Sequence, residues 1–266
     1  MMNSNQQTLQ QLEQIIRQAA NEELLPRFEH IERHFKADGS VVTEADYAMQ
    51  QRVTTELQQR WPAIPLLGEE MSEAEQQALI GDNQQGLWIL DPLDGTSNFA
   101  AGIPCFSVSL ALLVEGEITL GLVYDPLREE CFSAVAGDGA WLNGEPLQAG
   151  SSELPLSKCI AQVDFKRLPA EMAARIASKP SYGSQRSFGS GTLDWCWLAV
   201  GRVQLYLHGK QKLWDYSAGQ LILHEAGGHS CTFEGEPVFR GKLESRSVIA
   251  ASQASYFEAW REYVVN

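Results

Sequence analysis

The sequence predicts an α+β protein in which helices are layered on mixed β-sheets. Apolar residues near the N-terminus recur at helical spacing, at Leu9, Leu12, Ile16 and Ala19. On both sides of Glu115-Gly116, large apolar residues alternate with other residues, which predicts an antiparallel hairpin. After residue 150, helical stripes and short strand-like runs follow one another. The sequence has no repeats or low-complexity tracts, so residues 1–266 are expected to form a single domain.

The first 60 residues are predicted to be mainly helical. Pro26 is expected to end or kink the first helix, because proline has no N–H group to donate. Further apolar residues at helical spacing then predict that the helix resumes, at Phe28, Ile31 and Phe35. After a turn at residues 38–40, Thr43 is expected to cap a second helix whose apolar face carries Ala45, Met49, Val53 and Leu57.

Strands are expected from residue 87 to residue 142. The apolar run 87–90 predicts a buried strand that ends on Asp91. A hairpin-type turn is expected at Asn143-Gly144. Between these two points the predicted strands are 106–112, 118–124, 131–136 and 140–142.

The rest of the chain is expected to alternate helices and strands. Asp215 opens a helix that Gly227-Gly228 closes, and residues 187–191 form a loop. The other predicted helices are 170–178, 193–200 and 253–264, and the predicted strands are 203–207 and 247–251.

The charge balance argues against nucleic acid and membranes as partners. Lys plus Arg number 20 and Asp plus Glu number 34, so the formal net charge is −14. A surface this acidic repels nucleic-acid phosphates and anionic lipids, and an acidic enzyme that binds anionic substrates needs bound cations. No apolar stretch approaches the ~20 residues of a membrane span, and the N-terminal segment lacks a signal-peptide pattern. A cytoplasmic location and reduced, buried cysteines are therefore expected.

Acidic residues occur where regular structure begins or ends: Asp46, Glu69-Glu70, Asp91 with Asp94, and Asp215. Each has a purely structural explanation. Asp46 completes a capping box with Thr43, Asp215 caps its helix, and the others lie in turns or at a strand end.

Together these residues predict a metal site. Asp91 ends a buried strand, and Asp94 is close enough to share a cation with it. Oxygen ligands of this kind suit Mg²⁺, and the Gly95 and Thr96 amides are expected to face phosphate oxygens at the start of a short helix. The pattern favours hydrolysis of a phosphate ester by a metal-activated water. The two aspartates are three residues apart, whereas haloacid-dehalogenase phosphatases have them two apart, so a covalent aspartyl-phosphate is disfavoured.

The sequence resembles the inositol monophosphatase family, the lithium-sensitive, magnesium-dependent phosphatase superfamily that includes fructose-1,6-bisphosphatases. The resemblance runs from about Lys36 to Ala251. It implies a layered α-β-α-β-α sandwich, a homodimer and two or three Mg²⁺ ions per subunit, with a metal-site half at 1–150 and a substrate-specificity half at 151–266. The motifs that carry it are Val42–Asp46, Gly68–Glu70, Trp88–Phe99, Trp214-Asp215 and Glu225–Gly228.

The resemblance also implies roles for individual residues. It implies that the first metal is bound by Glu69, Asp91 and the Leu93 carbonyl, and the second by Asp91, Asp94 and Asp215. Glu69 also touches a weaker third ion. The water is oriented and deprotonated by Asp46 and Thr96, with Glu70 in support. The phosphate is held by the Gly95 and Thr96 amides.

The substrate is a small phosphorylated metabolite of unresolved identity. In inositol-type members a stretch matching Gly189, Ser190 and Gly191 contacts the sugar, as do residues matching Asp94 and Asp215. An acid that aligns with His208 is missing here, and Lys210 and Lys212 follow it. These residues form either an ordinary solvated loop or a contact for a second anionic group.

Three functions therefore stay open. The first is hydrolysis of an inositol, sugar or polyol monophosphate. The second uses a bisphosphate, such as a 3′-phosphoadenosine 5′-phosphate-type nucleotide or fructose 1,6-bisphosphate. The third is a protein-binding module that retains the fold, which the intact set of acidic residues argues against.

Overall fold

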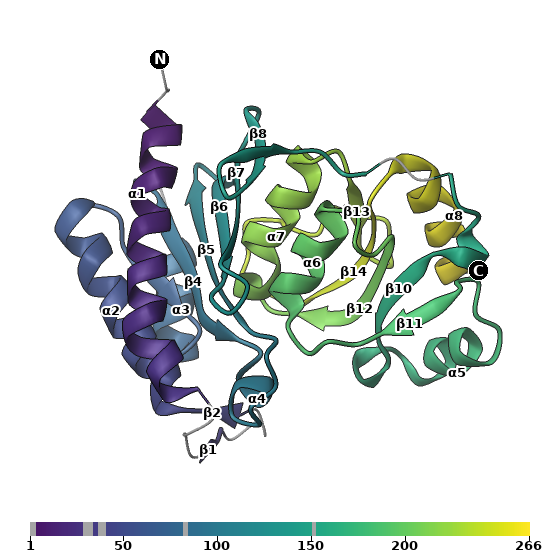
Figure 1. Cartoon of the computed structure of the whole chain (residues 1–266), viewed down its shortest axis with the longest axis horizontal. Helices are drawn as coiled ribbons and strands as arrows, with labels where there is room; N and C mark the ends of the chain where they lie inside the picture. Colours follow the sequence, from purple (N-terminus) through teal and green to yellow (C-terminus); the bar gives the residue numbers. More distant parts are fainter. Residues whose placement is uncertain (1–3, 29–33, 37–40, 82–84, 151–152) are drawn as a thin grey trace.

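The computed structural model describes residues 4–28, 34–36, 41–81, 85–150 and 153–266, which form five layers in the order α-β-α-β-α (Figure 1). Two sheets are separated by a pair of helices, and further helices cover the outer face of each sheet. The predicted layered sandwich is therefore confirmed. The helices of the successive layers are α1 (Ser4–Ala19) and α2 (Glu44–Arg60), then α6 (Gly191–Ala199) and α7 (Leu213–Glu225), then α5 (Ala170–Ser178) and α8 (Ala254–Val265).

The first α-helix ends at Ala19, before Pro26, and the prediction that the helix resumes is wrong at Phe35. After α1 the chain makes a π-helical turn (Ala20–Leu24) and a 3-10 turn (Leu25–Arg27) that contains Pro26. Phe35 lies in strand β1 (His34–Phe35), paired antiparallel with β2 (Val41–Val42). The helical prediction was wrong at Phe35 because antiparallel pairing with the nearby strand β2 overrode the helical spacing. Ile31 and the predicted turn at 38–40 lie outside the described residues.

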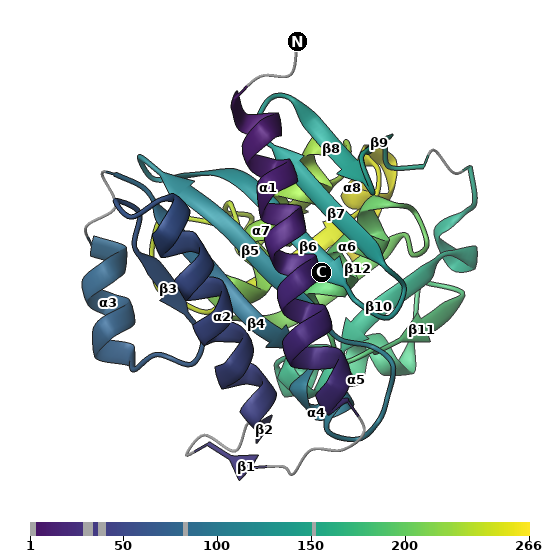
Figure 2. The ribbon, with the colours of Figure 1, turned by 60° about the vertical axis from the view of Figure 1, so that its left-hand side comes forward.

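The seven-stranded sheet has the order β3-β4-β5-β6-β7-β8-β9 (Figure 2). β3 and β4 are parallel and the other neighbours are antiparallel, including the predicted hairpin β5–β6. β4 passes its predicted end at Asp91 and runs to Asp94, with an irregular register against β5 between them. The predicted turn at Asn143-Gly144 joins β8 and β9. The strands are β3 (Leu66–Gly68), β4 (Leu87–Asp94), β5 (Ser107–Val114), β6 (Glu117–Asp125), β7 (Glu130–Val135), β8 (Gly139–Leu142) and β9 (Glu145–Leu147).

The five-stranded sheet has the order β11-β10-β12-β14-β13. β10 is parallel to both of its neighbours, and β14 is antiparallel to both of its own. The sequence predicted β12, β14 and the nearby helices, but not β10 or β11, nor α3 (Glu73–Gly81) beside β3. The strands are β10 (Ile160–Asp164), β11 (Ser184–Arg186), β12 (Leu205–Gln211), β13 (His229–Cys231) and β14 (Arg246–Ala251).

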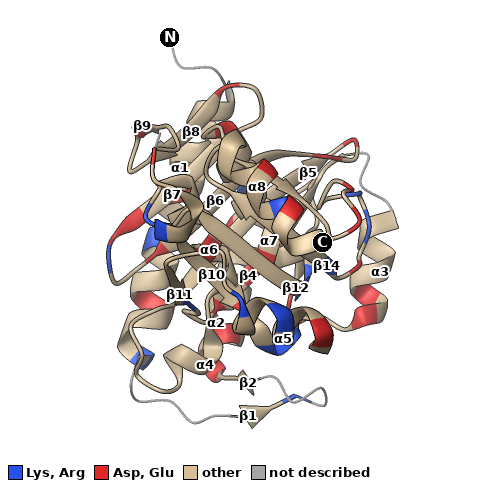
Figure 3. Ribbon diagram, turned by 90° about the vertical axis from the view of Figure 1, so that its right-hand side faces the viewer, with Lys and Arg blue, Asp and Glu red and all other residues tan. Residues whose placement is uncertain are grey.

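Apolar residues fill the spaces between the layers in three cores. One core joins α1 and α2 to the first sheet, a second surrounds α6 and α7, and a third lies under α5 and α8. All five cysteines are free and buried, as expected. Figure 3 shows acidic positions on α3 and charges of both signs on α5 and α8. Across the described ranges, no helix has the length and apolar character to cross a bilayer.

The contact between α6 and α7 is tightest at Gly219, and substitution there is expected to destabilise the fold. A Cβ atom on Gly219 would lie 2.5 Å from Trp195 Cβ, and the Trp195 side chain is fully buried. Gly219→Ala is expected to lower the free energy of unfolding by about 1–3 kcal/mol, measured by chemical denaturation. Gly81→Ala is the control, since a Cβ there meets nothing within 4 Å. Equal stability of the two variants would contradict this packing.

Candidate active site

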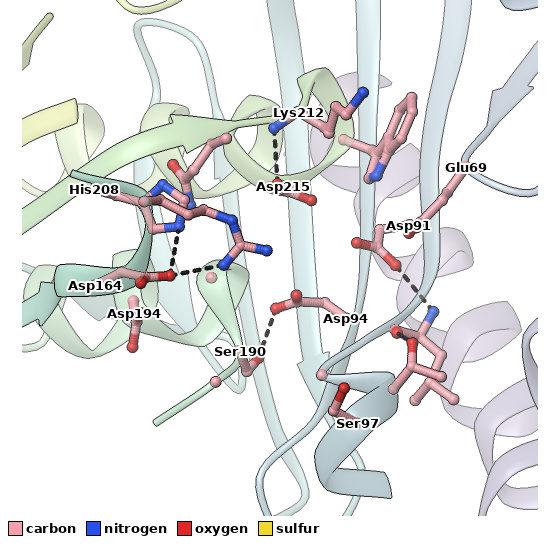
Figure 4. A pocket seen from close by; sticks show the side chains of 18 of the residues that line it. Glu69, Asp91, Asp94, Ser97, Asp164, Ser190, Asp194, His208, Lys212 and Asp215 are labelled. Carbon is pink, nitrogen blue, oxygen red and sulfur yellow. Dashed lines mark hydrogen bonds and ion pairs between the residues drawn. The ribbon is translucent and has the colours of Figure 1, made fainter. Parts of the chain in front are cut away.

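A pocket of about 470 Å³ lies between the carboxyl end of β4 and the second half of the chain (Figure 4). One wall comes from β4 and the short helix α4 (Thr96–Phe99), the other from β10, β12, α6 and α7. Among the described residues, three of the predicted site residues do not line this pocket: Asp46, Glu70 and Lys210. The predicted site residues that do line it are Glu69, Asp91, Leu93, Asp94, Gly95, Thr96, Gly189, Ser190, Gly191, His208 and Asp215.

Three predicted metal ligands converge in this pocket: Asp91, Asp94 and Asp215. One carboxylate oxygen of each lies within 4.8 Å of those of the other two. Asp91 and Asp94 flank the irregular stretch of β4. Asp215 is the third residue of α7, not its cap as expected; the cap is Lys212, whose N–H donates to Asp215 at 2.8 Å. The irregular strand and the helix start therefore bring distant carboxylates together.

These carboxylates form a buried cluster of like charges. Burial raises the pKa of Asp91 well above its usual range, and the negative charges of Glu69, Asp94 and Asp215 raise it further. Burial also raises the pKa of Asp215, followed by the effects of Asp94 and Glu69. Repulsion between these carboxylates is strong because the protein interior screens charges much less than bulk water does. A bound cation would relieve it.

Asp94 is oriented by the segment that begins α6. Its Oδ2 accepts hydrogen bonds from Ser190 Oγ at 2.6 Å, from the Thr192 N–H at 2.8 Å and from Thr192 Oγ1 at 2.7 Å. Three donors use the capacity of one carboxylate oxygen, so Oδ1 is the atom left for a cation. Ser190, predicted as a substrate contact through its backbone, thus positions Asp94 with its side chain.

Asp46 reaches the pocket through Thr96. It forms the predicted capping box of α2, in which Asp46 Oδ2 accepts the Thr43 N–H at 2.7 Å and Thr43 Oγ1 at 2.6 Å. Asp46 Oδ1 lies 3.0 Å from Thr96 Oγ1, which lies 2.9 Å from the Leu93 carbonyl oxygen. Burial raises the pKa of Asp46 to about 6, despite the opposing hydrogen bonds from Thr43 and Thr96. The carboxylate of Asp46 therefore completes the capping box of α2 and is also the hydrogen-bond partner of Thr96.

Lys36 is a pocket residue that the sequence-based prediction lacked. Its Nζ donates to Glu69 Oε1 at 3.1 Å and to Glu70 Oε1 at 2.6 Å. Burial lowers the pKa of Lys36, but the two carboxylates outweigh burial and raise it overall. Lys36 therefore offsets part of the negative charge beside the cluster. No motif singles it out, because a lone lysine has no characteristic spacing.

The segment from His208 to Lys212 is not the solvated loop considered above. Most of it belongs to β12, which pairs with β10 on one side and β14 on the other, and His208 is buried there. The backbone pairing of β12 leaves Lys210 exposed and outside the pocket lining, whereas Lys212 lines the pocket. The two lysines therefore do not act as one cluster.

The opposite wall contains ionisable residues that were not predicted. Asp164 ends β10, but Gln162 interrupts the apolar residues before it, so the sequence signal was weaker than the unbroken apolar run before Asp91. The residues after it form a 3-10 turn (Phe165–Arg167) with no recognisable motif. Asp194 lies on α6, and burial raises its pKa well above the usual range. The unpredicted lining residues on this wall are Asp164, Lys166, Arg167 and Asp194.

The fold agrees with comparisons to known proteins. The model of the inositol monophosphatase family matches residues 4–265. The Nus factor SuhB of Pasteurella multocida is 35% identical over 85% of this chain and 83% of its own. Inositol monophosphatase 1 of Solanum lycopersicum is 38% identical over 77% and 78%. The solved structure of a Thermotoga maritima IMPase superposes with a TM-score of 0.83 at 26% identity, over 97% and 96% of the two chains.

The chain therefore belongs to the inositol monophosphatase family. The family includes relatives named for phosphatase activity and relatives named as a Nus factor. Membership supports phosphatase activity, and the acidic cluster is consistent with a bound divalent cation.

Removal of one charge from the cluster is expected to stabilise the metal-free protein. The raised pKa of Asp91 means that the fold binds more protons than the unfolded chain above about pH 4. Wild-type stability therefore falls as pH rises through the window up to the raised pKa. With a chelator, Asp91→Asn is expected to raise Tm by about 4 °C, and the gain is expected to widen between about pH 5 and about pH 8.

Magnesium should reverse this order in thermal unfolding. Mg²⁺ is expected to raise the Tm of the wild type but not that of Asp91→Asn, because only the wild type keeps the full cluster. Asp138→Asn, an exposed change in the β7–β8 turn, is the matched control and should behave as the wild type. A Tm of Asp91→Asn that is lower than wild type in the chelator would contradict the repulsion argument.

Proposed function

We propose that this protein hydrolyses a small phosphate monoester of an inositol, sugar or polyol in the presence of Mg²⁺, releasing inorganic phosphate. The observation that carries the proposal is the convergence of Asp91, Asp94 and Asp215 in a pocket that Glu69 and Thr96 also line. These acidic groups come from β4, α7 and the end of β3. Their assembly raises the free energy of the metal-free fold, which is expected of a site built to bind cations.

The donor set fits magnesium. Every proposed ligand is an oxygen atom, as a hard divalent ion prefers, and the raised pKa values of Asp91 and Asp215 mark a negative charge that lacks a counterion. When bound, Mg²⁺ supplies Lewis-acid activation of water and of the phosphate ester. Two or three ions per subunit are expected from the family. Glu69, Asp91, the Leu93 carbonyl, Asp94 and Asp215 would hold them.

The chain itself supplies the proton acceptor and the orientation. Thr96 Oγ1 donates to Asp46 in our assignment, which leaves its oxygen lone pairs to accept a hydrogen bond from the attacking water. The pKa of Asp46 near 6 lets this carboxylate take up a proton at neutral pH more readily than an exposed aspartate. Glu70 supports this side through Lys36. The Gly95 and Thr96 amides are assigned to the phosphate oxygens.

The identity of the alcohol is proposed from the relatives and the pocket. The tomato relative is named inositol monophosphatase 1, which supports an inositol phosphate. A bisphosphate is the second candidate, because Lys166, Arg167 and Lys212 also line the pocket. A homodimer and a cytoplasmic location are part of the same proposal.

A binding role without catalysis is the third candidate. It is favoured by the relatives named Nus factor SuhB. It leaves unexplained why Asp46, Thr96 and the acidic cluster keep a mutually consistent arrangement. Hydrolysis and binding to a partner are compatible in one chain, so the decisive question is whether the pocket turns over an ester.

Phosphate release across a panel of esters is expected to identify the substrate. The purified protein is expected to release phosphate from inositol 1-phosphate faster than from fructose 1,6-bisphosphate or a 3′,5′-bisphosphate nucleotide, and only with Mg²⁺. Asp91→Asn is expected to lower kcat by at least about 10³-fold, because it removes a shared ligand. Asp138→Asn serves as the matched control. Absence of turnover by the wild type on all esters would favour the binding role.

Lithium is expected to inhibit the reaction, on the strength of the family resemblance. Inhibition should be measured as phosphate release at several Li⁺ concentrations with Mg²⁺ held constant, and NaCl at the same ionic strength is the control. An enzyme that is active but unaffected by Li⁺ would indicate an altered site around Asp94 and Asp215.

A further inference from the structure

The most informative unassigned group in the pocket is the carboxylate of Asp164. β10 and β12 are parallel neighbours, and their register pairs Asp164 with His208. In Figure 4, Asp164 and His208 lie on the side of the pocket away from Glu69 and Asp91, with Asp94 and Asp215 between. The carboxyl ends of parallel strands are common ligand-binding positions. This wall therefore faces the part of a substrate that projects away from the acidic cluster.

Hydrogen bonds fix the role of His208. Its Nδ1 accepts the Lys210 backbone N–H at 3.2 Å, so this nitrogen carries no proton. The ring proton must then sit on Nε2, which lies 3.3 Å from Asp164 Oδ2. In this arrangement the Nε2–H donor of His208 is directed at Asp164 rather than at a ligand. This arrangement argues against His208 as a cationic contact for a second phosphate.

Asp164 is held firmly and keeps acceptor capacity. Asp164 Oδ2 accepts a hydrogen bond from Arg167 Nη1 at 2.7 Å and also contacts His208. Asp164 Oδ1 accepts a hydrogen bond from the Lys166 backbone N–H at 3.0 Å. A carboxylate has about four acceptor positions, so one on Oδ1 is left. Burial raises the pKa of Asp164, but the hydrogen bonds from His208 and Arg167 and the positive charge of Arg167 outweigh it and hold the pKa below its usual range. Asp164 is therefore an ionised acceptor at neutral pH.

The backbone around Asp164 is also fixed. A Cβ atom on Gly209 would lie 1.9 Å from the Arg167 carbonyl oxygen, so only glycine lets β12 approach the 3-10 turn this closely. This contact packs the 3-10 turn that follows Asp164 against β12, the strand that carries His208. The carboxylate is thus positioned by both strands and by the turn.

We propose that Asp164 accepts a hydrogen bond from a hydroxyl group on the alcohol portion of the substrate, with His208 and Arg167 as positioning residues. The inference rests on the proposed phosphatase function and narrows its substrate class to polyhydroxylated alcohols. A second phosphate at this wall would meet the charge of Asp164, and Arg167 is already committed to that carboxylate. The acid that His208 replaces in the sequence is thus supplied by its neighbour across the sheet.

Kinetics with two esters test the proposal. For Asp164→Asn, kcat/KM for inositol 1-phosphate is expected to fall by about 10- to 100-fold, mainly through KM, because a hydrogen bond to a charged acceptor is lost. Phenyl phosphate has no hydroxyl group on its alcohol portion, and its kcat/KM is expected to change less than about 3-fold. Its turnover also reports that the variant is folded. Equal losses on both esters would overturn the proposal.

A transfer of the acid across the strand pair separates recognition from structure. Asp164→Asn combined with His208→Glu returns a carboxylate to the same wall. This double variant is expected to recover at least about 5-fold of the lost kcat/KM for inositol 1-phosphate. A purely structural role of Asp164 predicts no recovery, and that result would count against the inference. Asp138→Asn is the matched aspartate control.

Calorimetric titration of free myo-inositol, with Mg²⁺ and inorganic phosphate present, distinguishes this inference from the proposed function. The wild type is expected to bind it at least about 10-fold more tightly than Asp164→Asn. If such binding is found without hydrolysis of any ester, the phosphatase proposal fails and the role of Asp164 stands. If the two proteins bind myo-inositol equally, or neither binds it, the role of Asp164 is refuted whether or not esters are cleaved.

Discussion

The mutual repulsion of buried carboxylates is the constraint on which this structure depends. Burial and neighbouring acids raise the pKa of Asp91 and that of Asp215, and the carboxylates of Asp94 and Glu69 add to the negative charge. Such an arrangement survives only because large apolar cores on both sides hold β4 and α7 in place. The apolar cores therefore offset the destabilisation that repulsion between the carboxylates causes in the metal-free protein.

Several residues serve the fold and the site at once. Asp46 completes the capping box of α2 and also accepts a hydrogen bond from Thr96. Asp215 accepts a backbone hydrogen bond at the start of α7 and also belongs to the acidic cluster. Ser190 precedes α6 and orients Asp94 across the pocket. This double use explains why a structural explanation for each acid, taken singly, was reasonable. A helix cap and a functional carboxylate are not exclusive, because a carboxylate has two oxygens with separate partners.

The two walls of the pocket divide the chemistry. The β4 side carries the acidic cluster, to which we assign the cations, and the Asp46–Thr96 pair, to which we assign the water. The β10–β12 side presents the carboxylate of Asp164, which is flanked by basic residues. The first wall is assembled from motifs with a narrow choice of residues, since metal ligation demands oxygen donors at set positions. The second depends on a pair of parallel strands whose register places Asp164 beside His208.

The sequence by itself determined the layered α+β class, the hairpin β5–β6, the cap at Thr43 and the acidic residues of the cluster, because each depends on local spacing or on a compact motif. It failed at Phe35, at the end of β4 and from His208 to Lys212, where pairing between strands overrode the local pattern. Only the tertiary structure decided that Lys36 forms ion pairs with Glu69 and Glu70 and that Asp164 lies beside His208. Contacts between residues far apart in the chain leave no periodic signal, since their distance is set by the packing of whole layers.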